Sequence, residues 1–540
     1  MEQKNELDSI ERRNANYKPN IWNYSVLQSL TNKYDEEKYG RQVEMLKMEV
    51  SCIFEEVKDP LAKLELIDCI GKLALSHYFE KDIYKTLNMM VKNSDNFVSC
   101  MEENLYLTAL YFRILRTYGC EISQDVFLSF TNGMGQFTTS PDVDSKQILQ
   151  LLEASYHGME SEFLLDQAQV FATKNLMITA KNSLICPLHL SVEWFNVKRH
   201  IHAHEKENKT KSTLLQLGRL NFNISQAQQQ QDLKEILRWW NQLDLSETLT
   251  FTRNRVVESF LWSVGVASET QHASLRKWLT KVIMFVLIID DVYDIYGSME
   301  ELECFTRAVK RWEYAEVEQL PEAIRRCFCA LQDTTYDIDH QIQQEKGWDS
   351  VLPYLMKGGT DLCGALHVEA KWYHTGYTPR LWEYLSNGWI SSSGPLLSLV
   401  VLLGLPGRDV AETIELLEEN QEIIYYASLI IRLCNDQGTS TAELERGDAP
   451  SSILCYMREA NVTEEEAREH IRKIIGNLWK KINGLCVKGC PNLFQTPIKH
   501  IVNTARVANF IYQKGDGFSV PDGDTKNQVL SCLIEPFLLV

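Results

Sequence analysis

The sequence of 540 residues has no run of about 18 apolar residues, the length that a membrane-spanning helix needs. It also lacks alternating apolar and polar segments joined by Asn-Gly or Gly-Gly turns, so a sheet protein is not indicated. Its 14 cysteines lack the spacing of a zinc site, and their scatter is typical of reduced thiols in a cytosolic compartment. Basic charge is scarce, because 55 Lys and Arg stand against 73 Asp and Glu, a net charge of −18. Without a basic tract, nucleic acid is not expected as a partner.

Helical periodicity dominates what the sequence does contain. Apolar residues recur at i, i+3 and i+4 in 61–70 and again in 105–115, so an all-α fold is expected. The chain is too long for one ordinary domain, and the most polar mid-chain run, 205–212, is the best boundary. Pro19 and the absence of a helical period predict that the leader is an extended strap, or else a disordered tail. We therefore expect a strap at 1–30, an N-terminal helical domain at 31–212 and a C-terminal domain at 213–540.

An apolar helix is predicted to end in three carboxylates. The run 282–289 leads directly into Asp290, Asp291 and Asp294. Because a helix turns about 100° per residue, Asp290 and Asp294 lie about 40° apart on one face. Acids at the end of a buried helix repel one another unless a cation lies between them. Hard oxygen ligands suit Mg²⁺ or Mn²⁺, often together with substrate phosphates. The alternative is a solvated acidic helix end.

A second set of oxygen ligands recurs at helical spacing. Asn435, Thr439 and Glu443 stand at i, i+4 and i+8, within about 80° of one helix face. An amide, a hydroxyl and a carboxylate are a poor choice for a salt-bridged surface but suit a second metal locus. Arg432 lies one turn before Asn435 and could touch the same anion. The alternative is a helix start, in which Thr439 or Ser440 is the N-cap and Glu443 completes a capping box.

Cationic and aromatic side chains accompany these acids. Arg253 and Arg255 are expected on a helix antiparallel to the acidic one, where two guanidiniums would bind a phosphate in a fork geometry. The alternative is ion pairing with local acids such as Glu258. Trp262 and Phe518 could stabilise a cation with their ring faces, although ordinary core packing explains either one alone.

Two other clusters are better explained structurally. Asp142 and Asp144 could form a Brønsted acid pair, but they adjoin Pro141 in a turn-like segment, which favours a turn or a helix cap. His200 and His204 would share a helix face at a spacing that suits zinc. No Glu follows in the order of a metalloprotease helix and the flanks are basic, which favours a solvated face.

Four of these features occur together in the order of a known family. Residues 290–294 (DDVYD) match a DDxxD motif, 435–443 (NDQGTSTAE) match an NSE/DTE motif, and 253–255 (RNR) match RxR. Arg12-Arg13, then eight residues, then Trp22, match RR(x8)W. Over essentially its whole length the sequence resembles plant class I terpene synthases of the angiosperm subfamily that holds monoterpene, isoprene and α-farnesene synthases. Within that subfamily it is most similar to the α-farnesene synthases.

The resemblance implies an all-α protein with a C-terminal class I catalytic domain and an N-terminal helical barrel that has no active site of its own. It implies three Mg²⁺ or Mn²⁺ ions held by Asp290, Asp294, Asn435, Thr439 and Glu443, with Asp291 in support. Diphosphate would be bound by Arg253, Arg255, Arg432 and the metal ligands. Trp262 and Phe518 would form walls of the carbocation pocket. Arg12 and Arg13 would form the lid. Asp290, Asp294, Arg253 and Arg432 would act in the ionisation itself. The DxDD motif of class II enzymes is absent, because Ser145 follows Asp144.

Farnesyl diphosphate is the expected substrate, and ionisation followed by loss of a proton would give an acyclic sesquiterpene, (E,E)-α-farnesene. The alternative is a monoterpene synthase that makes ocimene, myrcene or linalool from geranyl diphosphate. A non-catalytic scaffold is a further reading, as is a chain-elongating prenyltransferase, which normally carries a second aspartate-rich motif where this chain has Asn435. The eleven residues before Arg12 do not resemble a transit peptide, so a cytoplasmic location is expected, or a plastid if the natural N-terminus is longer. We expect a monomer whose partner is a small prenyl diphosphate.

Overall fold

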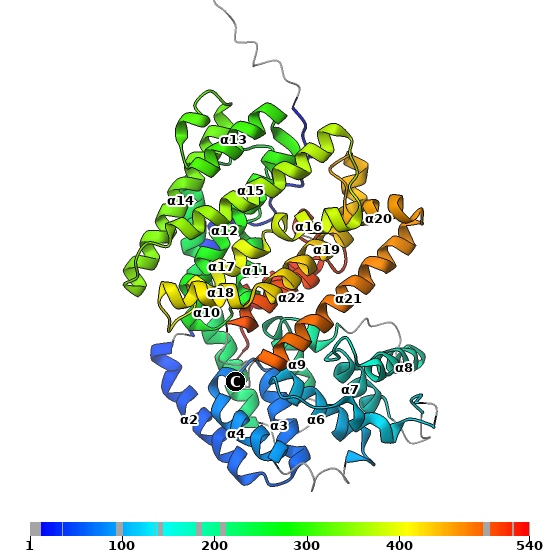
Figure 1. Ribbon diagram of the computed structural model, residues 1–540. Coiled ribbons are helices and arrows are strands. Elements are labelled where there is room, and N and C mark those ends of the chain that lie inside the picture. The colour runs from blue at the N-terminus through cyan, green and yellow to red at the C-terminus, as the bar shows by residue number, and fades with distance from the viewer. Residues whose placement is uncertain are drawn as a thin grey trace, which may run out of the picture.

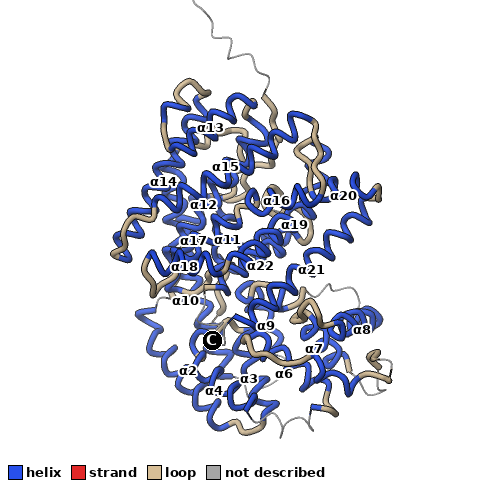
Figure 2. The backbone as a smooth tube through the Cα atoms, viewed as in Figure 1, coloured by secondary structure: helices blue, strands red, loops and turns tan. Residues whose placement is uncertain are grey.

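The computed structural model describes residues 12–34, 36–92, 101–133, 135–138, 144–179, 186–205, 212–489, 497–520 and 523–538. Across these residues the chain is helical (Figure 2), and the only β pairing is an isolated antiparallel bridge between Thr131 and Phe137. The all-α prediction is therefore confirmed. Within the same ranges, no helix is both long and apolar enough to cross a bilayer.

Two helical bodies follow one another along the chain, and the N-terminal one lies below in Figure 1. Asp59, Asn104 and Asp144 each begin a helix there by accepting a hydrogen bond from the backbone N–H three residues further on. Asp144 is thus a helix cap, as favoured, and Asp142 lies outside the described residues. The elements of this body are α2 (Glu36–Glu56), α3 (Pro60–Lys72), η2 (Ser76–Tyr78), α4 (Glu80–Lys92), α6 (Leu105–Thr117), η3 (Gln124–Phe130), α7 (Ser145–Ser155), α8 (Phe163–Thr179), η4 (Leu188–Leu190) and α9 (Glu193–Glu205).

The C-terminal body lies above, and α10 connects it to the first by packing against both α2 and α12. The boundary predicted at 205–212 falls between α9 and α10, and the domain limits drawn from it stay a prediction. The elements of this body are α10 (Ser212–Leu243), α11 (Val256–Val266), η6 (Thr270–His272), α12 (Ala273–Asp291), η7 (Val292–Tyr296), α13 (Met299–Arg311), η8 (Tyr314–Glu316), α14 (Glu322–Lys346), α15 (Leu352–Thr375), α16 (Leu381–Ser391), α17 (Gly394–Gly404), α18 (Val410–Glu419), α19 (Gln421–Arg446), α20 (Ser452–Ala460), α21 (Glu464–Gly489), α22 (Ile498–Tyr512), α23 (Gly523–Val529) and η10 (Leu530–Ile534). The short α1 (Tyr24–Gln28) belongs to the strap.

Apolar helices form the centre of the upper body. All residues of α11 are buried, and the helix packs against α12 and α22. The apolar α17 contacts both α12 and α19, and α19 packs along α22. The two predicted metal-binding segments, at the end of α12 and on α19, therefore rest on rigid, buried helices.

Gly265 allows α9, α11 and α22 to approach closely. A Cβ atom at this position would lie 2.5 Å from Cγ2 of Val507 and 2.8 Å from Cζ of Phe195. We expect Gly265→Ala to lower the free energy of unfolding by about 1–3 kcal/mol, the usual cost of overpacking a core, as measured by urea denaturation. Gly359→Ala on α15 is the control, because nothing lies within 4 Å of its new Cβ, and it should be neutral or slightly stabilising. Equal losses in the two variants would contradict the close approach at Gly265.

His200 and His204 do not lie together on a solvated face of α9. Nδ1 of His204 is 2.7 Å from the carbonyl oxygen of His200. Nε2 of His200 is buried without a hydrogen-bond partner among the described residues, and burial lowers the pKa of His200 to about 3. The prediction of a solvated face is therefore wrong for His200, because its ring turns inward between the two bodies.

His189 gives the fold a measurable pH dependence. Its Nε2 lies 2.8 Å from Oδ1 of Asn483, and burial, together with the charge of Arg506, lowers its pKa to about 3. An unfolded histidine titrates near 6.5, so between about pH 6.5 and 3 the unfolded chain binds a proton that the folded chain does not. The stability contributed by His189 is thus complete above pH 6.5 and falls below it, by up to about 1.4 kcal/mol per pH unit. We expect His189→Gln to flatten the dependence of melting temperature on pH between 6.5 and 5, and curves parallel to wild type would contradict the assignment.

Candidate active site

The acidic segment lies where α12 ends. The helix is buried on the side that packs into the bundle and ends at Asp291, and the π-turn η7 that follows carries Asp294. Asp291 is fully buried, whereas 29% of the Asp290 side chain is exposed. The two adjacent acids therefore have different surroundings, with Asp290 on the open side.

Arg253 forms ion pairs with both of these acids. The prediction that Arg253 lies on a helix is wrong, because α11 begins only at Val256 and Arg253 lies in the segment before it. Its Nη2 is 2.5 Å from Oδ2 of Asp290 and 2.9 Å from Oδ1 of Asp291, and its backbone N–H donates to Asp291 at 2.8 Å. Burial alone would lower the pKa of Arg253, but Asp291, Tyr17 and Asp290 raise it well above its ordinary value. The buried Asp291 thus binds Arg253, and its supporting role at a metal stays a prediction.

Arg255 is turned away from the acids and binds main-chain oxygens. It is 1% exposed, and its Nε donates to the carbonyl of Phe518 at 2.6 Å. Its Nη2 donates to the carbonyls of Lys18 and Ser519 at 2.5 and 2.9 Å. It forms no ion pair with Glu258 or any other carboxylate of the described residues. Arg255 therefore joins the N-terminal strap to the C-terminal segment, and the structure does not place it at the predicted contact with substrate.

Asn435, Thr439 and Glu443 lie in the interior of α19, which runs without interruption from Gln421 to Arg446. The alternative of a helix start at Thr439 is therefore wrong. The Thr439 hydroxyl instead donates to the carbonyl of Asn435 at 2.9 Å. Burial and the nearby charge of Asp436 raise the pKa of Glu443 to about 8. A carboxylate with so high a pKa is one that a nearby cation would stabilise.

The ends of α12 and α19 face one another. Burial raises the pKa of Asp294 well above its ordinary value, and the charges of Asp290, Glu369, Asp448 and Glu443 raise it further. A divalent cation between the two helices would neutralise this excess of negative charge. No three His, Cys, Asp or Glu side chains of the described residues form a ready cage for a metal. Oxygen donors such as these suit Mg²⁺, which is usually bound by one or two carboxylates and completed by substrate phosphate oxygens.

A cavity of about 90 Å³ opens beside these acids. Rings of Trp262 and Phe518 stack in its wall, with centroids 5.5 Å apart. Its polar rim is formed by Arg253, Asp290, Arg432, Asn435 and Ser391–Ser393, and the rest of its wall by Ile283, Val286, Leu287, Leu397, Ile431 and Tyr512. Residues predicted from three separate motifs thus meet at one largely apolar hollow, and Arg255 is not among them.

Glu369 on α15 is a site residue that no sequence pattern indicated. It is 7% exposed, its Oε1 accepts hydrogen bonds from Ser391 Oγ at 2.5 Å and Asn387 Nδ2 at 3.1 Å, and its Oε2 lies 3.7 Å from Nη2 of Arg432. Nη2 of Arg432 also donates to Ser391 at 2.8 Å, while its Nε is buried without a partner among the described residues. Glu369 and Ser391 therefore fix Arg432 at the rim and leave its Nε free to donate a hydrogen bond.

Arg13 connects the strap to both ligand-bearing helices. Its Nη1 donates to the carbonyl of Asp294 at 2.9 Å, and its Nη2 lies 2.6 Å from Oδ1 of Asp448, two residues beyond the end of α19. The Asp448 side chain is only 7% exposed and also accepts from Nε of Arg446 at 2.8 Å. One arginine thus touches the acidic segment of α12 and the end of α19 together.

Arg12 and Trp22 hold the strap on either side of this contact. Arg12 donates to the carbonyl of Tyr296 at 2.8 Å and binds Glu301 through both terminal nitrogens, at 2.8 and 3.0 Å. Nε1 of Trp22 donates to Oε1 of Glu258 at 2.8 Å. The arginine pair and the tryptophan of the N-terminal motif therefore all make contacts in the upper body, as a lid requires.

Two family models match the chain. The one described as "Terpene synthase, N-terminal domain" covers residues 21–194, and "Terpene synthase family, metal binding domain" covers residues 241–481. An α-farnesene synthase of Ricinus communis is 48% identical over 98% of this chain and 96% of its own length. An (E,E)-α-farnesene synthase of Malus domestica is 45% identical over 98% and 94%. A (−)-α-terpineol synthase of Vitis vinifera is 40% identical over 98% and 91%.

Solved structures share the fold over the whole chain. Limonene synthase with 2-fluorolinalyl diphosphate superposes with a TM-score of 0.92 at 35% identity, covering 98% of this chain and 100% of the other. Isoprene synthase of grey poplar, Populus x canescens, in complex with three Mg²⁺ ions and dimethylallyl-S-thiolodiphosphate, superposes with a TM-score of 0.86 at 36% identity, covering 96% and 99%. The predicted fold of two helical domains is confirmed. With both family models and full-length relatives in agreement, the chain belongs to the terpene synthase family.

Proposed function

We propose that the protein converts farnesyl diphosphate to (E,E)-α-farnesene and inorganic diphosphate. The observation that carries the reaction class is the meeting of one residue from each set of oxygen ligands, Asp290 and Asn435, with two arginines, Arg253 and Arg432, at the rim of a largely apolar cavity. The substrate is supported by the two full-length farnesene synthase relatives. The proposal includes a monomeric enzyme in the cytoplasm.

Ionisation requires that negative charge be stabilised as the C–O bond breaks. Mg²⁺ bound between α12 and α19 would supply most of this stabilisation to the diphosphate oxygens. Arg432, oriented by Glu369 and Ser391, and Arg253, bound to Asp290, would take the remaining charge through preorganised N–H donors. The electron pair of the C–O bond leaves with the diphosphate, and an allylic cation stays in the cavity.

The cavity wall then decides what becomes of this cation. The faces of Trp262 and Phe518 would stabilise it by about 0.5–2 kcal/mol each in a dry site. Loss of a proton from a carbon next to the cation gives the new double bond of an acyclic hydrocarbon, and we assign the released diphosphate as the base. Water must be excluded until this proton has left, because it would otherwise trap the cation as an alcohol.

A monoterpene synthase that uses geranyl diphosphate is the second candidate, and the α-terpineol synthase relative favours it. Gas chromatography of the products after separate incubations with farnesyl and geranyl diphosphates and Mg²⁺ distinguishes the two. We expect α-farnesene from the first substrate at the higher kcat/KM, and no product when EDTA replaces Mg²⁺. A higher kcat/KM with geranyl diphosphate would select the second candidate. Longer prenyl diphosphates would indicate a prenyltransferase, and no turnover of either substrate would indicate a scaffold.

A further inference from the structure

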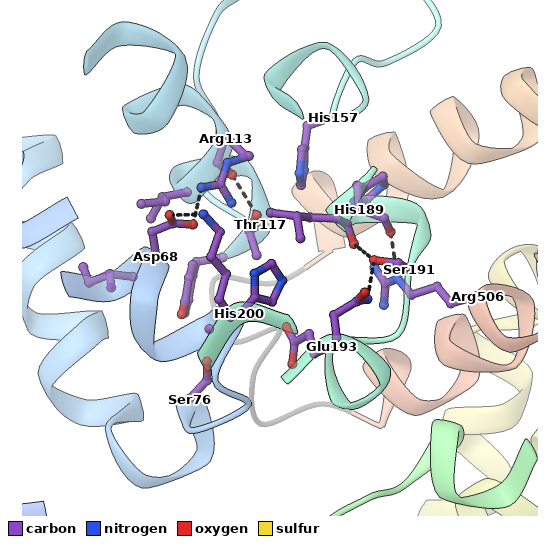
Figure 3. Close-up of a pocket in the computed structure, with 17 residues that line it drawn as sticks. Asp68, Ser76, Arg113, Thr117, His157, His189, Ser191, Glu193, His200 and Arg506 are labelled. Atoms are coloured by element: carbon purple, nitrogen blue, oxygen red, sulfur yellow. Dashed lines mark hydrogen bonds and ion pairs between the residues drawn. The ribbon is translucent and has the colours of Figure 1, made fainter. Parts of the chain in front are cut away.

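A cavity with charged side chains in its wall lies between the two helical bodies, and none of its lining residues lines the candidate active site. It measures about 90 Å³ and adjoins a second cavity of about 90 Å³, with which it shares Thr117, His157, His189, Glu193 and Arg506. One water needs only about 10–15 Å³ of such space, so several atoms fit. Figure 3 shows side chains of α3, α6 and α9 from the lower body, and Arg506 from α22, around the same space.

Arg113 brings surplus positive charge to one side of this cavity. It is 7% exposed and forms an ion pair with Asp68, but Asp68 also binds Nζ of Lys72 at 2.7 Å. Two cations therefore share this carboxylate, and the charge of Glu153 also acts on Arg113. Nε of Arg113 is buried and has no hydrogen-bond partner among the described residues. A buried N–H of this kind is costly, and native proteins normally supply it with a partner such as water or an ion.

Arg506 reaches the same cavity from α22. Its Nε donates to the carbonyl of His189 at 2.8 Å, and its Nη1 donates to Oδ1 of Asn503 at 2.9 Å. Within the described part of the chain, no carboxylate lies at ion-pair distance from it. Burial lowers the pKa of Arg506, and the charge of Glu193 offsets this only in part.

His157 and His200 add neutral donors. His157 is 5% exposed, and its ring stacks on His189 with centroids 4.1 Å apart. Its ring nitrogens make no hydrogen bond to a described residue, and Nε2 of His200 is likewise buried without one. Burial and the positive charges of Arg113, Arg506 and other neighbours keep the pKa of His157 well below its ordinary value. Neutral imidazoles beside cations present N–H groups that suit an anion.

The acids at the cavity do not cancel this charge. Three cationic side chains line it, against the two acids Asp68 and Glu193. Asp68 pairs with both Lys72 and Arg113, and Oε2 of Glu193 lies 3.4 Å from Nζ of Lys499. Behind the lining, Glu153 accepts a hydrogen bond from the backbone of Leu188, and burial raises the pKa of Glu153. The lining thus carries one more cationic side chain than it carries acids.

We propose that this cavity binds a phosphate-type oxyanion, held between Arg113 and Arg506 and capped by N–H groups of His157 and His200. Guanidinium groups match the oxygens of such an anion with paired N–H donors. The anion would join α6 and α9 to α22, and α22 packs along α19, the helix of the second ligand set. Inorganic phosphate and the diphosphate released by the proposed reaction share this chemistry. The cavity itself does not depend on the proposed function.

Thermal unfolding of the whole chain in EDTA tests the site, because EDTA prevents metal-dependent anion binding at α12 and α19. Inorganic phosphate and diphosphate are titrated separately, with chloride keeping ionic strength constant. We expect a saturable rise in melting temperature of about 2–3 °C. The rise should be lost in Arg506→Gln and retained in Arg472→Gln, an exposed arginine of α21 with the same change of charge. If diphosphate binds more tightly than phosphate, the site exists and its ligand is the reaction product. If phosphate binds more tightly, the site exists and its ligand is free phosphate.

A second variant covers the case in which Arg506→Gln does not fold. His157→Phe keeps the ring that stacks on His189 but removes both nitrogens, and it should raise the half-saturating anion concentration at least about fivefold. Circular dichroism confirms that each variant is folded. Three results would overturn the proposal: no saturable shift in the wild type, a wild-type response in the folded cavity variants, or loss of the response in Asp290→Asn, which would place the anion at the catalytic motifs.

Discussion

Asp290→Asn is expected to lower kcat/KM by at least about 10³-fold, equivalent to about 4 kcal/mol of transition-state stabilisation. The amide keeps the shape of the side chain and an oxygen that can accept from Nη2 of Arg253, which lies 2.5 Å from Oδ2 of Asp290 in the wild type. The helical fold should therefore survive. What it removes is the negative charge on the open side of α12, where a metal ion and the diphosphate would meet. Steady-state kinetics with farnesyl and geranyl diphosphates over a range of Mg²⁺ concentrations measure the loss of kcat/KM. Circular dichroism checks that the variant is folded.

Asp361→Asn is the matched control, because this carboxylate lies on the surface of α15 and, among the residues that the structure describes, its ion pair is with Nζ of Lys357, at 2.6 Å. Its kinetics should remain within about twofold of wild type, since an exposed pair contributes about 1 kcal/mol or less. Retention of a tenth or more of wild-type activity by Asp290→Asn, at unchanged Mg²⁺ dependence, would exclude Asp290 as a metal ligand.

Loss of the contact between Arg13 and Asp448 should admit water to the reaction. Arg13→Gln and Asp448→Asn are each expected to reduce kcat/KM about tenfold and to raise the share of terpene alcohol in the product. The physical reason is that this ion pair, 2.6 Å long and largely buried on the Asp448 side, holds the strap against the ends of α12 and α19. An open strap leaves the cation exposed to water, which traps it before the proton is lost.

A double-mutant cycle isolates this contact. If the two side chains act through one another, the double variant should be little worse than either single one, with a coupling free energy of about 1 kcal/mol. Arg472→Gln on α21, which breaks an exposed ion pair with Glu465, controls for the loss of charge. Strictly additive effects, with an unchanged ratio of alcohol to hydrocarbon, would contradict the lid contact.

The arrangement of the set on α19 could be predicted because it is local to one helix, whereas α12 ends at Asp291 and Asp294 lies on η7. Asn435, Thr439 and Glu443 share a face through helical periodicity alone, and α19 is long enough to keep that periodicity without a break. The sequence did leave open a helix start at Thr439. The structure excludes it because an apolar stretch packed on α17 and α22 carries the helix through. Local pattern and tertiary packing agree here.

The surroundings of the arginines could not be predicted, because they depend on distant or unpatterned partners. The start of α11 has no side-chain cap, so nothing local showed that Arg253 precedes the helix. Arg255 binds carbonyl oxygens, which every residue has, so no spacing identifies its partners. Glu369 acts on Arg432 from another helix, and only the fold brings the two together.

The contacts of the strap also set the order in which the molecule can be completed on the ribosome. The strap is synthesised first, but Arg255, Glu258, Glu301 and Asp448, to which it binds, follow their strap partners by at least 236 residues. Since chains fold progressively as they emerge, the strap must wait undocked while the lower body forms. Arg255 delays docking further, because it also binds Phe518 and Ser519 near the end of translation. A chain stopped after α19 would therefore carry every proposed metal ligand and still leave the proposed carbocation open to water.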